Sequence, residues 1–556
     1  MVTFTLIVSS ILFAVQTQAS PVLTPRTLEI PHIDPQKILC QLPILKKFLC
    51  PLTGTAALNR QTPIGIANGV LDPDGAYRFI VKYASANRWA PSAVVTAWNL
   101  PTGSANPSTM PLACPQPFVD SSAYTEDCLS MILYVPPSLS LTSAAPTLIW
   151  VHGGSFILGS GSAPGLDGSK LAIATGSIIA VVQYRLGALG FLSPDGTTNL
   201  AVKDLVSAMQ FLKKVVPAFG GSASKITLAG QSSGANMIRA LLATPSASSL
   251  FRSAILQSDP MNFGFLNPTT HQALQSSFND IVGCSAIDIS CRDSLSLDTI
   301  IDAEMDIFSN AVSIDPAAGP SQPIRPVRDG SFITSPLDST AAFPSVSKPI
   351  LLTTVLQEAG YAIYGNYNTP QTVADFSDTC NDILGPARTQ SIFAAPYYSI
   401  APATGTVDTR VQLQNLGTDY LWKCSGWTFA RNWAQHGGPA YVGQYVIGAS
   451  YPGNEIVSYC TQPGVVCHQD DIQIVFGTTS NPTSVQSALT TQMQKRYKAF
   501  LANGNPNAAG VPTWTAVAAS DVHALQLGGS GEAPIGACDP SFWGQGVQYD
   551  YQFYSN

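Results

Sequence analysis

Charged side chains are scarce in this chain of 556 residues. They make up 11% of it, against about 25% in an average soluble domain, and hydrophobic residues make up 45%. A chain disordered by charge is therefore excluded, and the length allows a large buried core. The 27 Lys and Arg residues are outnumbered by 34 Asp and Glu, for a net charge of -7. Because no basic excess is available to neutralise a phosphate backbone, we expect no nucleic-acid partner.

Apolar runs long enough to span a membrane are also missing. The apolar run near the start, residues 4–15, is interrupted by Ser9 and Ser10 and is followed by small residues up to Ala19. A membrane span needs about 20 continuous apolar residues, whereas a shorter run ahead of small residues is typical of a secretory signal peptide. We therefore predict a signal peptide over residues 1–19, a secreted, extracellular protein, and no stable membrane span.

Cysteine, by contrast, is plentiful, with eleven residues. In the oxidising compartments of export, cysteines that lie close in sequence tend to form disulfides, and an odd count leaves one unpaired. None of the spacings is that of a zinc ribbon, so we expect no metal site. The close pairs are Cys40 with Cys50, Cys114 with Cys128, Cys284 with Cys291, and Cys460 with Cys467.

Residues 20–58 are rich in proline and are interpreted as an N-terminal extension, with a single domain over residues 59–556. Within that domain, continuous apolar runs over residues 145–151 and 177–183 predict buried parallel strands. Apolar residues spaced by three or four predict a helix over 199–219, directly followed by a short strand. Strands alternating with helices at these lengths indicate an α/β fold, with a parallel sheet covered on both faces.

The strand predicted over residues 225–229 leads into Gly230-Gln231-Ser232-Ser233-Gly234 and then into a helix-prone stretch. A serine between two glycines at a strand-to-helix turn is typical of a nucleophile elbow, and the glycines avoid collisions with the neighbouring elements. The same five-residue motif also arises by chance in chains rich in glycine. The strand before it and the helix after it favour Ser232 as a catalytic nucleophile.

Attack by a serine on a carbonyl group creates an oxyanion, which needs preorganised N–H donors worth about 3 kcal/mol each. The strand over residues 145–151 delivers a glycine-rich turn upstream of the elbow. We predict an oxyanion hole there, although an ordinary glycine turn is the alternative. Its donors would be the backbone N–H groups of Gly153, Gly154, Ser155 and Ser233.

These motifs resemble the type-B carboxylesterase and lipase family, which includes the cholinesterases, and secreted fungal carboxylesterases most of all. The resemblance covers roughly residues 60 to 545 and implies the α/β-hydrolase fold, with a large, mostly parallel central sheet. Three positions depart from the family pattern: Gln231 replaces a Glu, Ser222 an Asp, and Ser155 a third Gly. The matching stretches are Glu126-Asp127-Cys128-Leu129, Trp150 to Phe156, Tyr184 to Leu192, Phe219-Gly220-Gly221 and the elbow.

A serine nucleophile needs a base oriented by an acid, in the chain order serine, acid, histidine. Of six histidines, His468 stands in a stretch similar to the family's His-x-x-acid motif, and we predict that it is the base. His436 is interpreted as a histidine at a helix C-terminus, and His523 lies in an uninformative stretch. For the acid, Glu358 ends an apolar strand where the family has a Glu, although a solvated strand-end carboxylate is the alternative.

The resemblance also implies supporting roles and disulfides. Ser258 and Asp471 match family positions that support the catalytic residues. The implied disulfides join Cys114 with Cys128, Cys284 with Cys291, and Cys424 with Cys538. Together with the pairs expected from proximity alone, Cys40 with Cys50 and Cys460 with Cys467, they leave Cys380 as the odd thiol.

The stretch between Cys114 and Cys128 corresponds to the family's loop over the active site. Here it is short and holds no Trp, which argues against a large interfacial lid and against an aromatic face for a quaternary ammonium. Phe118 and Tyr124 are candidates for the mouth of the site.

We therefore predict a serine esterase of small, mostly apolar carboxylic esters, which acts through an acyl-enzyme and needs no cofactor or metal. The oligomeric state is left open. A lipase of longer-chain acylglycerols, a noncatalytic adhesion protein of the same fold, and non-hydrolytic use of the same pocket are the alternatives.

Overall fold

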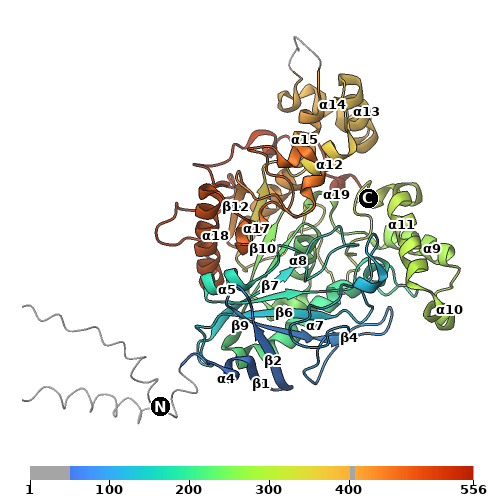
Figure 1. The fold of residues 1–556 in the computed structure, drawn as a ribbon. Helices are drawn as coiled ribbons and strands as arrows, with labels where there is room; N and C mark the ends of the chain where they lie inside the picture. The colour runs from blue at the N-terminus through green and yellow to red at the C-terminus, as the bar shows by residue number, and fades with distance from the viewer. Residues whose placement is uncertain (1–49, 401–406, 555–556) are drawn as a thin grey trace, which may run out of the picture. The chain divides into compact units, whose positions relative to one another are not determined.

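The computed structural model describes residues 50–400 and 407–554. The predicted signal peptide, most of the predicted extension and Cys40, the expected partner of Cys50, lie outside the described residues. All described residues belong to a compact unit that runs from residue 47 to residue 556. At its centre is an eleven-stranded sheet with the strand order β1-β2-β3-β6-β8-β7-β9-β10-β11-β12-β13 (Figure 1).

Seven neighbouring strands of this sheet run parallel, and four strands at one edge run antiparallel. The parallel strands are β8 (Ile178–Val182), β7 (Ala145–Val151), β9 (Gly221–Gln231), β10 (Ser253–Gln257), β11 (Ile350–Val355), β12 (Ala440–Tyr445) and β13 (Leu525–Leu527). The antiparallel strands are β1 (Asn59–Thr62), β2 (Gly65–Leu71), β3 (Tyr77–Lys82) and β6 (Ser130–Val135). A separate short pair joins β4 (Ala84–Ser85) to β5 (Ala93–Val94).

Alternating side chains of the central strands enter two different hydrophobic clusters, one on each face of the sheet. Ile149 and Val151 of β7 pack into the first cluster, whereas Leu148 and Trp150 pack into the second. Helices α7 (Leu200–Val215), α8 (Ser233–Leu242) and α16 (Cys424–Gln435) contribute to the first cluster. Helices α5 (Ser169–Thr175), α17 (Ile472–Phe476) and α18 (Ser484–Asn503) contribute to the second. The prediction of a mostly parallel sheet covered on both faces is therefore confirmed.

Most element boundaries agree with the sequence pattern, and the differences have local causes. The strand predicted over residues 145–151 is β7. The helix predicted over 199–219 ends as an α-helix at Val215 and continues as a 3-10 turn, Val216–Phe219, because Pro217 lacks the N–H that the helix needs. The strand predicted over 225–229 is the longer β9, whose polar first half carries no apolar signal.

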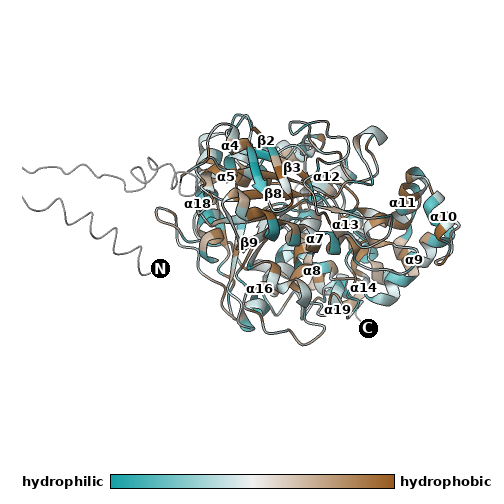
Figure 2. Cartoon of the chain, turned by 90° about the horizontal axis from the view of Figure 1, so that it is seen from below, coloured by the Kyte–Doolittle hydropathy of each residue, from teal (hydrophilic) through white to brown (hydrophobic). Residues whose placement is uncertain are grey.

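Two groups of helices follow the carboxyl ends of β10 and β11 (Figure 1). Between β10 and β11 lie α9 (Pro268–Val282), α10 (Ile289–Ser294) and α11 (Leu297–Ile314). Between β11 and β12 lie α12 (Gly360–Asn366), α13 (Val373–Leu384), α14 (Pro386–Ala394), α15 (Arg410–Thr418) and the π-helical turn η7 (Asp419–Lys423). The remaining α-helices of the described residues are the short α4 (Thr55–Leu58), α6 (Gly187–Phe191) and α19 (Asp550–Phe553). Figure 2 shows α8 as mostly apolar and the outlying helices α9–α11 with hydrophilic faces.

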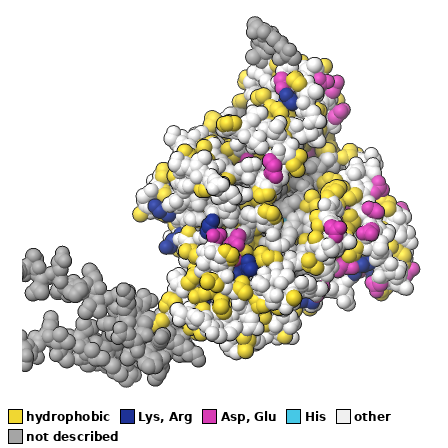
Figure 3. Space-filling view, in the orientation of Figure 1, with side chains coloured by type: hydrophobic (Ala, Val, Ile, Leu, Met, Phe, Trp, Pro, Cys, Tyr) yellow, Lys and Arg dark blue, Asp and Glu magenta, His cyan; other side chains and the backbone are white. Residues whose placement is uncertain are grey.

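Four disulfides tie the described chain together, at the pairs Cys114–Cys128, Cys284–Cys291, Cys424–Cys538 and Cys460–Cys467. These are pairs that the sequence analysis expected, and Cys380 is a free, buried thiol. Lys and Arg side chains are few and scattered on the face in Figure 3. Within residues 50–400 and 407–554, no helix combines the length and apolar character that crossing a bilayer requires.

Candidate active site

Ser232 stands at the turn between β9 and α8, with φ 57° and ψ -128°. The flanking glycines make this turn possible, because strand β7 passes very close to both. A Cβ atom on Gly230 would lie 2.7 Å from the carbonyl oxygen of Val151, and one on Gly234 would lie 2.2 Å from the same atom. The predicted elbow is thus present, with Ser232 at the N-terminus of α8, where the helix dipole favours developing negative charge.

His468 and Glu358 form a close pair. Nδ1 of His468 lies 2.6 Å from Oε2 of Glu358, and the other carboxylate oxygen accepts the backbone N–H of Val355 at 2.8 Å. The Glu358 side chain is fully buried, whereas that of His468 is 19% exposed. A carboxylate held in this way fixes the orientation of the imidazole and can stabilise a cation on it.

The second ring nitrogen of His468 contacts Gln231, the residue before Ser232. Nε2 of His468 lies 3.0 Å from Nε2 of Gln231. The sequence analysis did not foresee this contact, because β9 and the loop that carries His468 are distant in sequence. Gln231 was singled out only as a departure from the family pattern.

The turn predicted as an oxyanion loop packs directly against the nucleophile. A Cβ atom on Gly153 would lie 3.0 Å from that of Ser232, and one on Gly154, at φ 124°, would lie 2.2 Å from the carbonyl oxygen of Leu158. Ser155 also has a positive φ, 54°, and its hydroxyl lies 3.5 Å from the amide nitrogen of Gln322. The structure thus brings Gly153 against Ser232, the residue directly before Ser233 at the start of α8.

Behind His468, Asp471 closes a buried hydrogen-bond chain. One oxygen of Asp471 accepts the amide N–H of Gln257, whose amide oxygen accepts the hydroxyl of Tyr497 at 3.0 Å. The backbone carbonyl of Gln257 accepts the N–H of Ser232 at 2.8 Å. Burial, followed by the nearby charge of Glu358, raises the pKa of Asp471 to about 7. Asp471 therefore braces the strand end under Ser232 through Gln257.

Ser258, the other predicted support, follows β10. Its backbone N–H donates to the carbonyl of Thr353 at 2.7 Å, and its hydroxyl is buried without a hydrogen-bond partner among the described residues. The hydrogen bond to Asp471 is made by the preceding residue, Gln257.

The side chains of the other described histidines have partners other than the triad residues. His436 caps the C-terminus of α16 and its Nδ1 contacts the carbonyl of Asn432 at 2.7 Å, which confirms the interpretation made from the sequence. His152 is stacked on Tyr184, and burial lowers its pKa to about 4. His271 contacts the carbonyl of Phe191 at 2.9 Å. His523 forms, with Asp521 and Glu532, a group of possible metal ligands outside this site.

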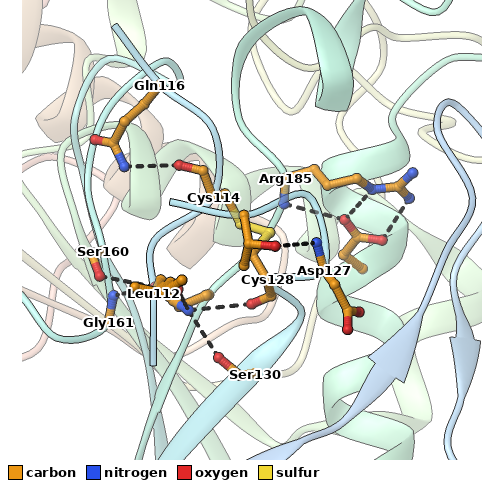
Figure 4. The surroundings of a disulfide bond; sticks show 12 residues. Leu112, Cys114, Gln116, Asp127, Cys128, Ser130, Ser160, Gly161 and Arg185 are labelled. Atoms are coloured by element: carbon orange, nitrogen blue, oxygen red, sulfur yellow. Dashed lines mark hydrogen bonds and ion pairs between the residues drawn. A yellow bond between two sulfur atoms is a disulfide. The ribbon is translucent and has the colours of Figure 1, made fainter. Parts of the chain in front are cut away.

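The loop between Cys114 and Cys128 is closed by their disulfide (Figure 4), and it is anchored to the chain that follows the oxyanion loop. Gln116 is the anchor: its amide donates to the carbonyl of Gly159 and accepts the N–H of the same residue, both at 2.9 Å. Of the two candidates for the mouth, Tyr124 is buried, whereas Phe118 is 82% exposed. The two candidates thus have opposite environments within one short loop.

A largely apolar cavity of about 340 Å³ begins beside the acid and the base. Its wall includes Ala359, which follows Glu358, and Trp422, whose ring centre lies 5.2 Å from that of His468. Pro320 and Ser321 also line it, directly before Gln322, the neighbour of Ser155. The cavity therefore adjoins the site at the base, and the chain segment that lines it continues into Gln322, which contacts Ser155.

The sheet, the elbow and the two helical groups define an α/β-hydrolase. The sequence model of the Carboxylesterase family matches residues 68–539. Among curated relatives, the "Crystal protein" of Dictyostelium discoideum is 28% identical over 402 residues, 70% of each chain. Pyrethroid hydrolase Ces2a of Mus musculus is 25% identical over 425 residues, 72% of each chain.

A solved structure of a PNB esterase has the same fold, with a TM-score of 0.66 at 22% sequence identity. The match covers 83% of this chain and 94% of that one. This chain belongs to the carboxylesterase family and is a carboxylic ester hydrolase, and its curated relatives include hydrolases and carboxylesterases.

Proposed function

We propose that this protein is a secreted serine carboxylesterase that cleaves small, mostly apolar esters through an acyl-enzyme intermediate. The proposal is supported by the contact of the His468–Glu358 pair with Gln231, the residue directly before Ser232, which stands at a strained turn. Secretion is supported by the four disulfides, since such bonds persist in oxidising compartments.

In the proposed reaction, His468 takes the hydroxyl proton of Ser232 while the serine oxygen attacks the ester carbonyl carbon. Glu358, buried against Nδ1, stabilises the imidazolium that results. The backbone N–H groups of Gly153, Gly154 and Ser233 receive the oxyanion. The carbon–oxygen bond to the alcohol then breaks, and the alcohol leaves with the proton from His468. Water repeats the sequence and releases the carboxylic acid.

The apolar cavity supports the choice of substrate. An engineered cavity of about 150 Å³ holds a benzene molecule, so the 340 Å³ found here accommodates a larger aromatic ring system or a medium-length aliphatic chain. Ile363, Leu413 and Leu416 line the cavity. Cys380 also lines it, and its free thiol is neutral because burial raises its pKa to about 12. An uncharged, apolar portion of an ester is therefore the group that fits.

The test is a panel of p-nitrophenyl esters with acyl chains of increasing length, with Ser232→Ala as the control. We expect hydrolysis of short and medium acyl chains, and a fall of about 10⁴-fold or more in kcat for Ser232→Ala, because a triad without its nucleophile keeps little activity. Turnover only on emulsified long-chain acylglycerols would indicate a lipase. Failure of an organophosphate to label Ser232, together with no turnover, would indicate a noncatalytic protein.

A further inference from the structure

The side-chain amide of Gln231 is the hydrogen-bonding partner of Nε2 of His468. The Gln231 side chain is completely buried at the end of β9, and its Nε2 lies 3.0 Å from Nε2 of His468. Nδ1 of the same ring faces the carboxylate of Glu358 at 2.6 Å and therefore carries the proton. Nε2 is thus the ring nitrogen with the free lone pair, and the amide N–H of Gln231 donates to it.

The other end of the amide faces the oxyanion loop. A Cβ atom on Gly153 would lie 2.9 Å from Oε1 of Gln231, and this buried oxygen accepts no hydrogen bond from the described residues. The amide therefore fills the space between the base and the oxyanion loop, with its polarity fixed by the contact with His468.

We propose that Gln231 is a positioning residue for ester hydrolysis: it holds the neutral imidazole of His468 at Nε2 and yields this nitrogen to the Ser232 hydroxyl when an ester binds. The inference rests on the proposed function, because it assigns a role within the same site. Gln231 has no charge, so it orients the base without adding an anion to its surroundings.

The lack of charge on Gln231 is important because His468 is already surrounded by carboxylates. Glu358 faces the ring at Nδ1, and Asp470 and Asp471, which follow in the chain, interact with the imidazole electrostatically. A hydrogen bond donated to the neutral ring favours the neutral, basic form, whereas a carboxylate at the same place favours the protonated form. The amide thus keeps the base available at lower pH than a carboxylate would.

The test is the pH profile of kcat/KM for the wild type, Gln231→Met and Gln231→Glu on a short p-nitrophenyl ester. Methionine removes the donor at similar length, and glutamate replaces it with a carboxylate. The acidic limb is the part of the profile where kcat/KM falls as the pH is lowered. We expect this limb to lie at higher pH in Gln231→Met than in the wild type, and at still higher pH in Gln231→Glu, which should shift it by about one to three pH units. Gln435→Glu, on an exposed glutamine at the end of α16, is the matched control and leaves the limb in place.

Coincident acidic limbs for the three proteins would overturn the inference, because a side chain that only fills space changes stability or the plateau rate and leaves the limb unmoved. The pH dependence of organophosphate labelling at Ser232 gives a second readout that needs no ester turnover. If the wild type is labelled but hydrolyses no ester, the proposed function fails, and the order of the labelling profiles still decides the role of Gln231.

Discussion

At the scale of single residues, Ser232 has a backbone conformation that side chains normally avoid. Such residues are strained by about 1–3 kcal/mol and persist only where their surroundings over-determine them. Here the N–H of Ser232 donates to the carbonyl of Gln257 at 2.8 Å, and the close approach of β7 leaves room only for glycine on either side. The hydroxyl is thereby held at the sheet edge, next to the oxyanion loop.

Glu358→Gln tests the acid of the proposed mechanism. The amide keeps the shape of the side chain but cannot stabilise an imidazolium or fix its tautomer, so we expect kcat to fall by about 10³- to 10⁴-fold with little change in KM. Steady-state kinetics on a short ester measure this. Asp382→Asn, on the exposed surface of α13, should behave as the wild type. Equal kcat for the two variants would exclude Glu358 from the reaction.

How far the sequence predicts the site depends on whether each contact is local. The elbow and the oxyanion loop are short motifs next to recognisable strands, so Ser232 and Gly153 could be named from the sequence. His468 and Glu358 needed the family resemblance, because nothing in their local sequence indicates that they meet. The contact between Gln231 and His468 was missed, since it depends on how a strand end packs against a distant loop.

At the scale of elements, the helices between β11 and β12 form much of the apolar cavity. Residues of α12, α13 and α15 line it, whereas the central sheet carries Ser232 and Glu358. These helices were not predicted from the sequence. With seven residues, α12 is shorter than the window in which helical periodicity can be recognised. The substrate pocket was therefore beyond the reach of the sequence analysis, although the sheet was not.

Ala362→Phe tests whether this cavity receives the ester. Ala362 is an exposed residue of α12 that lines the cavity, so a larger side chain there narrows it without overpacking the core. We expect kcat/KM for medium-length or aromatic acyl esters to fall by about 10-fold or more, which corresponds to about 1.4 kcal/mol, while acetate esters keep their rate. Tyr361→Phe, at the neighbouring exposed position, is the control. A uniform loss on all esters would contradict the assignment of the pocket.

At the scale of the whole molecule, buried carboxyl groups make stability depend on pH. Glu304 of α11 is buried, and one of its oxygens accepts the N–H of Ala188 at 2.7 Å. Burial raises its pKa from 4.5 to about 8. Burial also raises the pKa of Asp470 to about 6 and that of Asp471 to about 7. All three groups bind protons more tightly in the folded chain than in the unfolded one.

The sign of the effect follows from proton linkage. Between pH 4.5 and about 8, the unfolded chain releases the Glu304 proton while the folded chain keeps it, so the free energy of unfolding falls as the pH rises. Glu304→Gln removes this contribution and keeps an acceptor for Ala188. We therefore expect a smaller drop in melting temperature between pH 5 and pH 8 for the variant than for the wild type, measured by calorimetry.

Asp302→Asn, at an exposed position on the same helix, serves as the reference for this measurement. Its melting temperature should follow the wild type at both pH values. If the melting temperatures of Glu304→Gln and the wild type drop equally between pH 5 and pH 8, Glu304 does not keep its proton in the folded protein.

The order of the elements along the chain also matters for when the protein becomes active. Ser232 follows β9, whereas His468 follows β12 and is set beside the Cys460–Cys467 disulfide. A polypeptide emerging from the ribosome thus presents its serine long before the histidine that deprotonates it has been made. In the proposed mechanism, nascent and prematurely terminated chains therefore hydrolyse no esters. The cell that makes this protein is not exposed to the activity while the chain is being synthesised.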